Sequence, residues 1–123
     1  MRALRPRSGQ ARKRFGQHFL EPAWVAKLVD ALATDPDDTF LEIGPGRGAL
    51  TVPLSARVRR VVAVEIDRDL ASALPARLPD LRLVQADFLD VNLSDLLRDE
   101  RTPVRVVGNL PYNVASPILF KLL

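Results

Sequence analysis

A chain of 123 residues is long enough for one compact domain and too short for two. Hydrophobic residues make up 47% of it and charged residues 27%, a balance typical of a folded core rather than a disordered segment. No apolar run reaches the roughly 20 residues of a membrane-spanning helix, so we expect no membrane partner. The absence of cysteine excludes disulfides and thiolate metal sites and suits a reducing compartment, so we expect a cytoplasmic protein.

Positive charge is concentrated at the start of the chain. Residues 1–14 form an arm with six basic side chains and no acid, so the net charge of +3 divides into +6 in the arm and −3 in the rest. Guanidinium groups bind phosphates by charge and by paired hydrogen bonds, so the arm predicts a nucleic-acid partner. A solvated tail is the structural alternative, and the Arg-rich, Ser-containing start is also compatible with a transit peptide.

The first predicted element is a helix that opens at Glu21–Pro22 and ends before the turn cluster TDPDDT (34–39). Its apolar residues recur at helical spacing: Trp24, Val25, Leu28, Val29 and Leu32. A short apolar strand, FLEI (40–43), then runs into a glycine-rich turn. Residues 49–58 predict a helix that Pro53 should kink or shorten.

The rest of the chain continues this alternation of strands and helices. Strands are predicted at 61–66, 81–86 and 104–108, and helices at 67–78, interrupted near Pro75, and at 93–98. Residues 109–113 read as a loop, and Ser116–Pro117 begins a last helical stretch, ILFKLL. Apolar strands separated by helices predict right-handed β-α-β units and a parallel sheet with flanking helices. Because the chain stops within that last stretch, we expect a fold truncated after its fourth strand.

The turn EIGPGRG (42–48) stands between a strand and a helix, which is the context of a nucleotide-type cofactor turn. Glycine permits positive φ and close approach of a ligand. Ala49 replaces the third glycine of a dinucleotide pattern, and no Lys-Ser/Thr pair follows to make a P-loop. Glu42, two positions before Gly44, disfavours a pyrophosphate and suits a cofactor with a cationic amino acid end. A purely structural turn is the alternative.

Two further acids follow the next two strands. Glu65 lies 21 residues after Gly44, where doubly wound folds place a carboxylate on ribose hydroxyls. Asp87 follows the third strand, where it can accept a hydrogen bond from an adenine amino group, with Phe88 against the ring. Each acid alone is compatible with a solvated strand end or a helix cap. Together they predict a nucleoside cofactor at the carboxyl ends of the strands.

The loop after the fourth strand is a candidate for the chemistry. The Asn109 side chain and a backbone carbonyl of Leu110 or Pro111 can accept hydrogen bonds from an adenine N6 amino group. Those bonds favour a pyramidal nitrogen whose lone pair points at a methyl donor. Tyr112 offers a face on which an unpaired base can stack. A sulfonium is already a strong electrophile, so positioning suffices without a general base. A plain turn after a strand is the alternative.

Five segments together resemble a known family, the ribosomal RNA adenine dimethyltransferases. They are RKRFGQHFL (12–20), LEIGPGRGALT (41–51), VVAVEID (61–67), QADFLD (85–90) and NLPYN (109–113). The resemblance implies a class I, Rossmann-like methyltransferase fold over 15–123 that uses S-adenosyl-L-methionine. It also implies two methylations on each of two adjacent adenines near the 3′ end of 16S RNA, within an immature 30S subunit. We expect a monomer without a metal.

The resemblance also assigns residues. The family's cofactor contacts fall on His18, Leu20, Gly44, Glu65, Asp87 and Asn109, with Gly46 and Phe88 lining the same pocket. The target-adenine loop falls on Asn109, Leu110, Pro111 and Tyr112. Position 18 is commonly asparagine in the family, and the imidazole of His18 can also donate a hydrogen bond. The family continues past residue 123 with further strands, another aromatic residue and a small helical domain for RNA, so the resemblance leads us to expect an incomplete methyltransferase domain.

Three other functions share parts of this pattern. A related methyltransferase modifies 23S RNA and confers macrolide resistance. A descendant that kept the fold can act as a non-catalytic RNA-binding assembly or transcription factor. An NAD-dependent dehydrogenase shares the sheet but not the Asn-Leu-Pro-Tyr loop.

Overall fold

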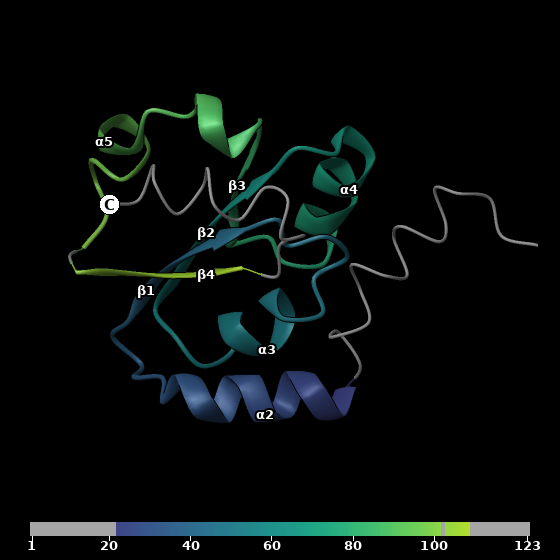
Figure 1. Ribbon diagram of the computed structural model, residues 1–123, viewed down its shortest axis with the longest axis vertical. Coiled ribbons are helices and arrows are strands. Elements are labelled where there is room, and N and C mark those ends of the chain that lie inside the picture. The colour runs from purple at the N-terminus through teal and green to yellow at the C-terminus, as the bar shows by residue number, and fades with distance from the viewer. Residues whose placement is uncertain (1–21, 102, 109–123) are drawn as a thin grey trace, which may run out of the picture.

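The fold is built on a four-stranded parallel sheet in the order β3-β2-β1-β4. The computed structural model describes residues 22–101 and 103–108. Figure 1 shows the sheet running through the middle of the molecule, with helices on both sides. The strands are β1 (Thr39–Ile43), β2 (Arg60–Glu65), β3 (Arg82–Gln85) and β4 (Val104–Gly108). All four predicted strands and their parallel pairing are therefore confirmed.

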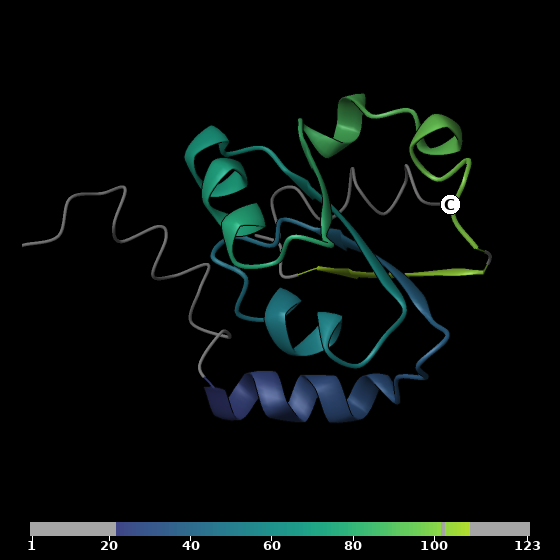
Figure 2. The same cartoon turned by 180° about the vertical axis from the view of Figure 1, so that it is seen from behind.

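Helix α2 precedes β1, the other helices connect successive strands, and together they cover the two faces of the sheet. Helices α2 and α3 lie together on one side of β4 and β1, whereas α5 lies on the other side (Figure 1 and, from behind, Figure 2). Two short 3₁₀ helices, η2 and η3, extend these connections. The α-helices and 3₁₀ helices have these bounds: α2 Pro22–Leu32, α3 Thr51–Ser55, α4 Arg68–Ala73, η2 Leu74–Ala76, η3 Phe88–Asp90 and α5 Leu93–Leu96.

The core has a layer on each face of the sheet, because successive side chains of a strand point to opposite faces. One layer packs the odd residues of β1 and the even residues of β2 against η3 and α5. It contains Leu41, Ile43, Val62, Val64, Phe88 and Leu96. The other layer packs the alternate residues against α3, and it contains Phe40, Leu54, Val58 and Val61. The central strand β1 is buried along its whole length.

Prolines shorten two of the predicted helices. Helix α3 contains Pro53 in its first turn and spans only five residues, because proline fits a first turn but cannot continue an α-helical hydrogen-bond ladder. Helix α4 gives way to the 3₁₀ turn η2 at Pro75. In α2 the predicted apolar positions divide, with Val29 buried and Trp24 52% exposed. Among the described helices, none is long and apolar enough to cross a membrane.

The order of the strands places a reversal between β1 and β4. The chain proceeds outward from β1 to β2 and β3, then returns to the other side of β1 to form β4. In open parallel sheets, ligands bind outside the carboxyl ends of the strands at such a switch point. Ile43 pairs with Val64 on one side and with Gly108 on the other. The glycine-rich turn therefore leaves the sheet at the switch point.

Candidate functional site

Every second residue of the turn after β1 is a glycine with a left-handed backbone conformation. Gly44, Gly46 and Gly48 have φ values of 72°, 59° and 88°, a region that strongly favours glycine. The Gly44 N–H donates to the Val64 carbonyl at 2.9 Å and continues the sheet for one residue. The Gly48 N–H donates to the Pro45 carbonyl at 2.9 Å, which closes the turn before α3 begins.

Two of these glycines serve different purposes. A Cβ added to Gly48 would lie 2.6 Å from Leu74 Cδ1, so the Leu74 side chain would have to move to admit it. A Cβ added to Gly46 would meet nothing within 4 Å. Gly46 therefore leaves open space above the turn, where a ligand can approach the backbone.

Glu65, the last residue of β2, holds the turn in place. Its Oε1 accepts a hydrogen bond from the Gly46 N–H at 2.8 Å, and its Oε2 accepts one from the Asp67 N–H at 2.9 Å. The residue is 5% exposed. Each carboxylate oxygen has two lone pairs, so both oxygens keep capacity for a second donor such as a ribose hydroxyl. A carboxylate bonded to the turn also repels a pyrophosphate there.

Glu42 lies on the same face as Glu65 and is buried beneath the turn. Its Oε1 accepts a hydrogen bond from the Thr51 hydroxyl at 2.6 Å. Burial raises the pKa of Glu42 to about 7, the Thr51 hydrogen bond opposes this rise, and the charge of Glu65 adds to it. The Glu42 carboxyl therefore keeps its proton to a higher pH than an exposed glutamate does. A cationic group bound nearby would lower its pKa, because it favours the carboxylate.

Asp87 reaches the same edge of the sheet from β3. The Ala86 N–H donates to the Glu65 carbonyl at 2.9 Å, so Asp87 follows a residue bonded directly to the end of β2. Its Oδ1 accepts from the Leu89 N–H at 3.0 Å and caps η3. Phe88 is 4% exposed and packs in the core with Leu96. A contact between Phe88 and a cofactor stays a prediction.

The remaining predicted site residues lie outside the described part of the chain: His18, Leu20, Asn109, Leu110, Pro111 and Tyr112. Gly108, the last described residue before the predicted loop, pairs with Ile43 at the switch point. The structure thus brings together the glycine turn, Glu65 and Asp87, and brings the end of β4 beside them. Within residues 22–101 and 103–108, no group of three acids or histidines could hold a metal ion.

Sequence reasoning missed two contributions to this site. It assigned Glu65 to a ligand only, whereas the carboxylate also bonds the backbone of the turn and of the start of α4. It did not identify Thr51, whose hydroxyl is the buried partner of Glu42. A polar residue in the first turn of the helix after a glycine turn, otherwise surrounded by apolar positions, was the available signal.

The carboxyl ends of the strands thus combine an open glycine turn with carboxylate acceptors on neighbouring strands. This combination fits the hydroxyl and amino donors of a nucleoside. The parallel sheet with this turn at its switch point has the Rossmann-like fold of class I methyltransferases. Residues 8–123 match the family model described as "Ribosomal RNA adenine dimethylase". The chain belongs to this ribosomal RNA adenine dimethylase family.

Similar proteins agree with this assignment. The chain is 45% identical, over 98% of its length, to the ribosomal RNA small subunit methyltransferase A of Psychrobacter cryohalolentis. It is 51% identical, over 93% of its length, to the protein of that name from Bordetella avium. It covers 44% and 43% of these two proteins, so the chain spans less than half the length of the curated relatives it matches.

Solved structures agree as well. A dimethyladenosine transferase from Plasmodium falciparum superposes with a TM-score of 0.68 at 28% identity, over 83% of this chain and 36% of that one. The 23S rRNA methyltransferase ErmE superposes with a TM-score of 0.68 at 34% identity, over 81% of this chain and 40% of that one. Both proteins share the fold of this chain, and the second is named for its action on 23S rRNA.

Proposed function

We propose that the protein is an S-adenosyl-L-methionine-dependent methyltransferase that dimethylates N6 of two adjacent adenines near the 3′ end of 16S RNA. Its partner is the immature 30S subunit. Family membership supports the methyltransferase activity, and the names of the bacterial relatives favour the small-subunit RNA over the 23S RNA of ErmE. We further propose that the protein works as a monomer in the cytoplasm.

The observation that carries this proposal is the bond between Glu65 and the glycine turn at the switch point. It fixes a carboxylate beside the open backbone at Gly46. In our proposal Glu65 accepts hydrogen bonds from the ribose hydroxyls, and Asp87 accepts one from the adenine amino group of the cofactor. The bound cofactor supplies an electrophilic sulfonium methyl group. The residues of the chain bind and orient the two reactants and exclude water, which is sufficient for this transfer.

We assign the target adenine to Asn109, Leu110, Pro111 and Tyr112, which lie outside the described residues. The pairing of Gly108 with Ile43 supports this assignment, because it puts the residue before Asn109 beside the last residue of β1. The side-chain oxygen of Asn109 and a backbone carbonyl of Leu110 or Pro111 accept hydrogen bonds from the N6 amino group, and Tyr112 stacks on the base. The target base must leave its helix or lie unpaired to enter such a site.

The decisive experiment is to incubate the full-length protein with labelled cofactor and under-methylated 30S particles, and then to map the labelled bases. We expect label on two adjacent adenines near the 3′ end of 16S RNA. A parallel reaction with 23S RNA tests the rival activity, and labelled 23S RNA alone would overturn the proposed substrate. The Asn109→Ala variant tests a non-catalytic role, because an RNA-binding assembly factor would keep its biological activity without this side chain.

A Tyr112→Ala variant tests the assignment of the loop. Loss of the stacking face removes roughly 1–3 kcal/mol of base binding. We therefore expect methyl transfer to fall about 10-fold or more, while the dissociation constant of the cofactor, measured by calorimetry, stays within about twofold. Equal losses in transfer and in cofactor binding would contradict a stacking role for Tyr112.

A further inference from the structure

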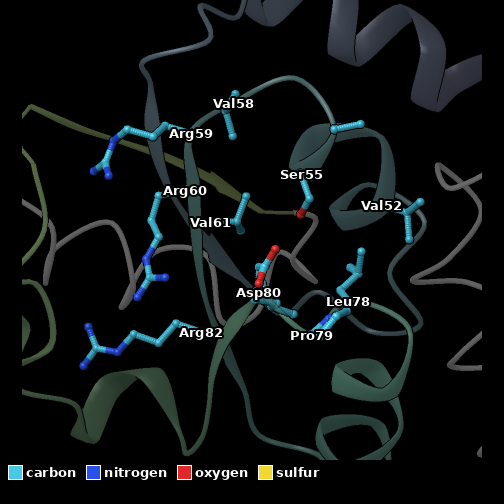
Figure 3. A pocket seen from close by; sticks show the side chains of 12 residues that line it. Val52, Ser55, Val58, Arg59, Arg60, Val61, Leu78, Pro79, Asp80 and Arg82 are labelled. Carbon is cyan, nitrogen blue, oxygen red and sulfur yellow. The ribbon is translucent and has the colours of Figure 1, made fainter.

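Three arginines line up at the amino-terminal ends of β2 and β3, at the opposite edge of the sheet from the glycine turn. Arg59 precedes β2, Arg60 is its first residue, and Arg82 is the first residue of β3. In Figure 3 their side chains extend to the same side of the two strands, one beside the next. They are among the residues that line an open cavity of about 900 Å³. We call these three residues the arginine row.

A single buried carboxylate orients two members of the row. The Glu100 side chain, 6% exposed, pairs with Arg60 Nε at 3.2 Å and with Arg82 Nη1 at 3.3 Å. Arg82 Nη1 also donates to the Leu96 carbonyl at the end of α5. Arg59 Nη2 donates to the Thr39 hydroxyl at 3.1 Å. The three guanidinium groups are therefore held in place by the fold.

The row keeps positive charge and free donor capacity. Arg60 and Arg82 share one carboxylate, Glu100, Arg59 bonds a neutral hydroxyl, and Asp80 also lines the cavity. Each guanidinium has five N–H donors, of which the bonds above use only part. The side chains of Arg60 and Arg82 are 34% and 37% exposed. Fixed, partly exposed guanidinium groups in excess over acids match the geometry and the charge of phosphate groups.

We propose that Arg59, Arg60 and Arg82 bind backbone phosphates of folded ribosomal RNA, as a second contact separate from the cofactor edge. This inference rests on the proposed RNA methyltransferase function. A strand rises about 3.3 Å per residue, so the six residues of β2 separate the two edges by roughly 17 Å. Two adjacent nucleotides bound at the cofactor edge are too short to reach the arginine row, whereas a folded RNA can touch both edges. The contact positions the substrate and carries no sequence readout.

The test compares two variants and their combination in the full-length protein: Arg59→Gln, Arg82→Gln and the double variant. Lys27→Gln is the matched control, because it removes one positive charge from α2 on the other face of the sheet. Binding is measured over a range of salt concentrations to a folded 16S RNA fragment, to 30S particles and to a short single-stranded RNA with two adjacent adenines. Thermal unfolding and cofactor binding are measured alongside.

We expect the double variant to bind folded RNA about 10-fold more weakly and to reduce the slope of log affinity against log salt by about 1–2, because each phosphate contact contributes about 0.9. Short RNA, cofactor binding and the control should change by less than about twofold. If Arg82→Gln does not fold because Glu100 loses a partner, Arg59→Gln alone should lower the slope by about 1. An unchanged slope overturns the inference, and so does a loss no larger than that of Lys27→Gln.

Two further outcomes separate this inference from others. Weaker binding to 30S particles with unchanged binding to protein-free RNA would assign the row to a ribosomal protein and overturn the RNA contact. Normal methylation by the wild-type protein together with unaffected binding by the variants would remove this inference alone. Absence of any RNA methylation by the wild-type protein would remove the proposed function as well.

Discussion

The carboxyl ends of the strands, here called the carboxyl edge, and their amino ends, the amino edge, differ in their charged groups. At the carboxyl edge the charged groups are mainly acids, and Glu65 accepts hydrogen bonds from backbone N–H groups of the turn and of the start of α4. At the amino edge the charged groups are mainly arginines, which bond side-chain oxygens and carbonyls of neighbouring elements. The acids shape a backbone that is open to a ligand, whereas the arginines join secondary-structure elements to one another.

This difference predicts which properties of the protein a substitution at each edge will change. Substitutions at the carboxyl edge should change both stability and cofactor affinity, because the same carboxylate serves the turn and the ligand. Substitutions at the amino edge should change stability or RNA binding and leave cofactor affinity alone. Each of the following experiments tests one side of this division.

The largest effect is expected for Glu65→Ala. The change removes two charge-assisted hydrogen bonds to backbone N–H groups, each worth about 1.5–3 kcal/mol, together with the proposed ribose acceptor. We expect the free energy of unfolding, measured with urea, to fall by about 3 kcal/mol. Cofactor affinity measured by calorimetry should fall about 30-fold or more. Glu65→Gln keeps the shape of the side chain and should lose less, whereas unchanged affinity in Glu65→Ala would refute a cofactor role.

Glu42 makes the stability of the carboxyl edge depend on pH. Its pKa rises from an ordinary value of 4.5 to about 7 in the folded protein. Between these values the folded protein keeps a proton that the unfolded chain releases, so the free energy of unfolding falls as pH rises. A shift of this size corresponds to a loss of up to about 3 kcal/mol, complete above pH 7.

The Glu42→Gln variant tests this pH dependence. Glutamine has nearly the shape of a protonated carboxyl group and can accept from the Thr51 hydroxyl, but it does not ionise. Unfolding midpoints measured from pH 5 to pH 8 should fall in the wild-type protein and stay nearly level in the variant. Parallel pH profiles for the two proteins would show that Glu42 is not the responsible group.

The two glycine variants distinguish packing from ligand access within the turn. Gly48→Ala combines positive φ with a contact of 2.6 Å to Leu74, so we expect a loss of about 2 kcal/mol in stability. Gly46→Ala has positive φ but open space, and should lose about 1 kcal/mol. Cofactor affinity should fall more in Gly46→Ala than in Gly48→Ala. The reverse order would mean that the ligand does not approach Gly46.

The smallest effect is expected at the amino edge, for Arg105→Met. Arg105 donates to the Leu32 carbonyl at 2.6 Å, pairs with Asp38 at 3.2 Å, and lies 4.9 Å from the centre of the Phe40 ring. These interactions are partly exposed, so stability should fall by less than about 1 kcal/mol. Cofactor affinity should not change. A measurable loss of affinity would show that the two edges are coupled.

The sequence predicted the features that depend on local pattern. Apolar runs located the four strands, and the distance between Gly44 and Glu65 located the acid that contacts the turn. It did not predict the shared pairing of Arg60 and Arg82 with Glu100, because the Arg60 contact spans 40 residues and depends on where α5 ends. The helical pattern of α2 also failed to show that Trp24 is half exposed, since periodicity does not tell which apolar residues the sheet covers.

The bridge that Glu65 makes between Gly46 and Asp67 has a kinetic consequence. Because both backbone amides already have a partner, the turn does not need to become ordered when a small molecule arrives. We therefore expect slow hydrogen exchange at these two amides without any ligand. Cofactor uptake should then be a single second-order event whose rate grows linearly with concentration and shows no plateau from a slow rearrangement of the loop.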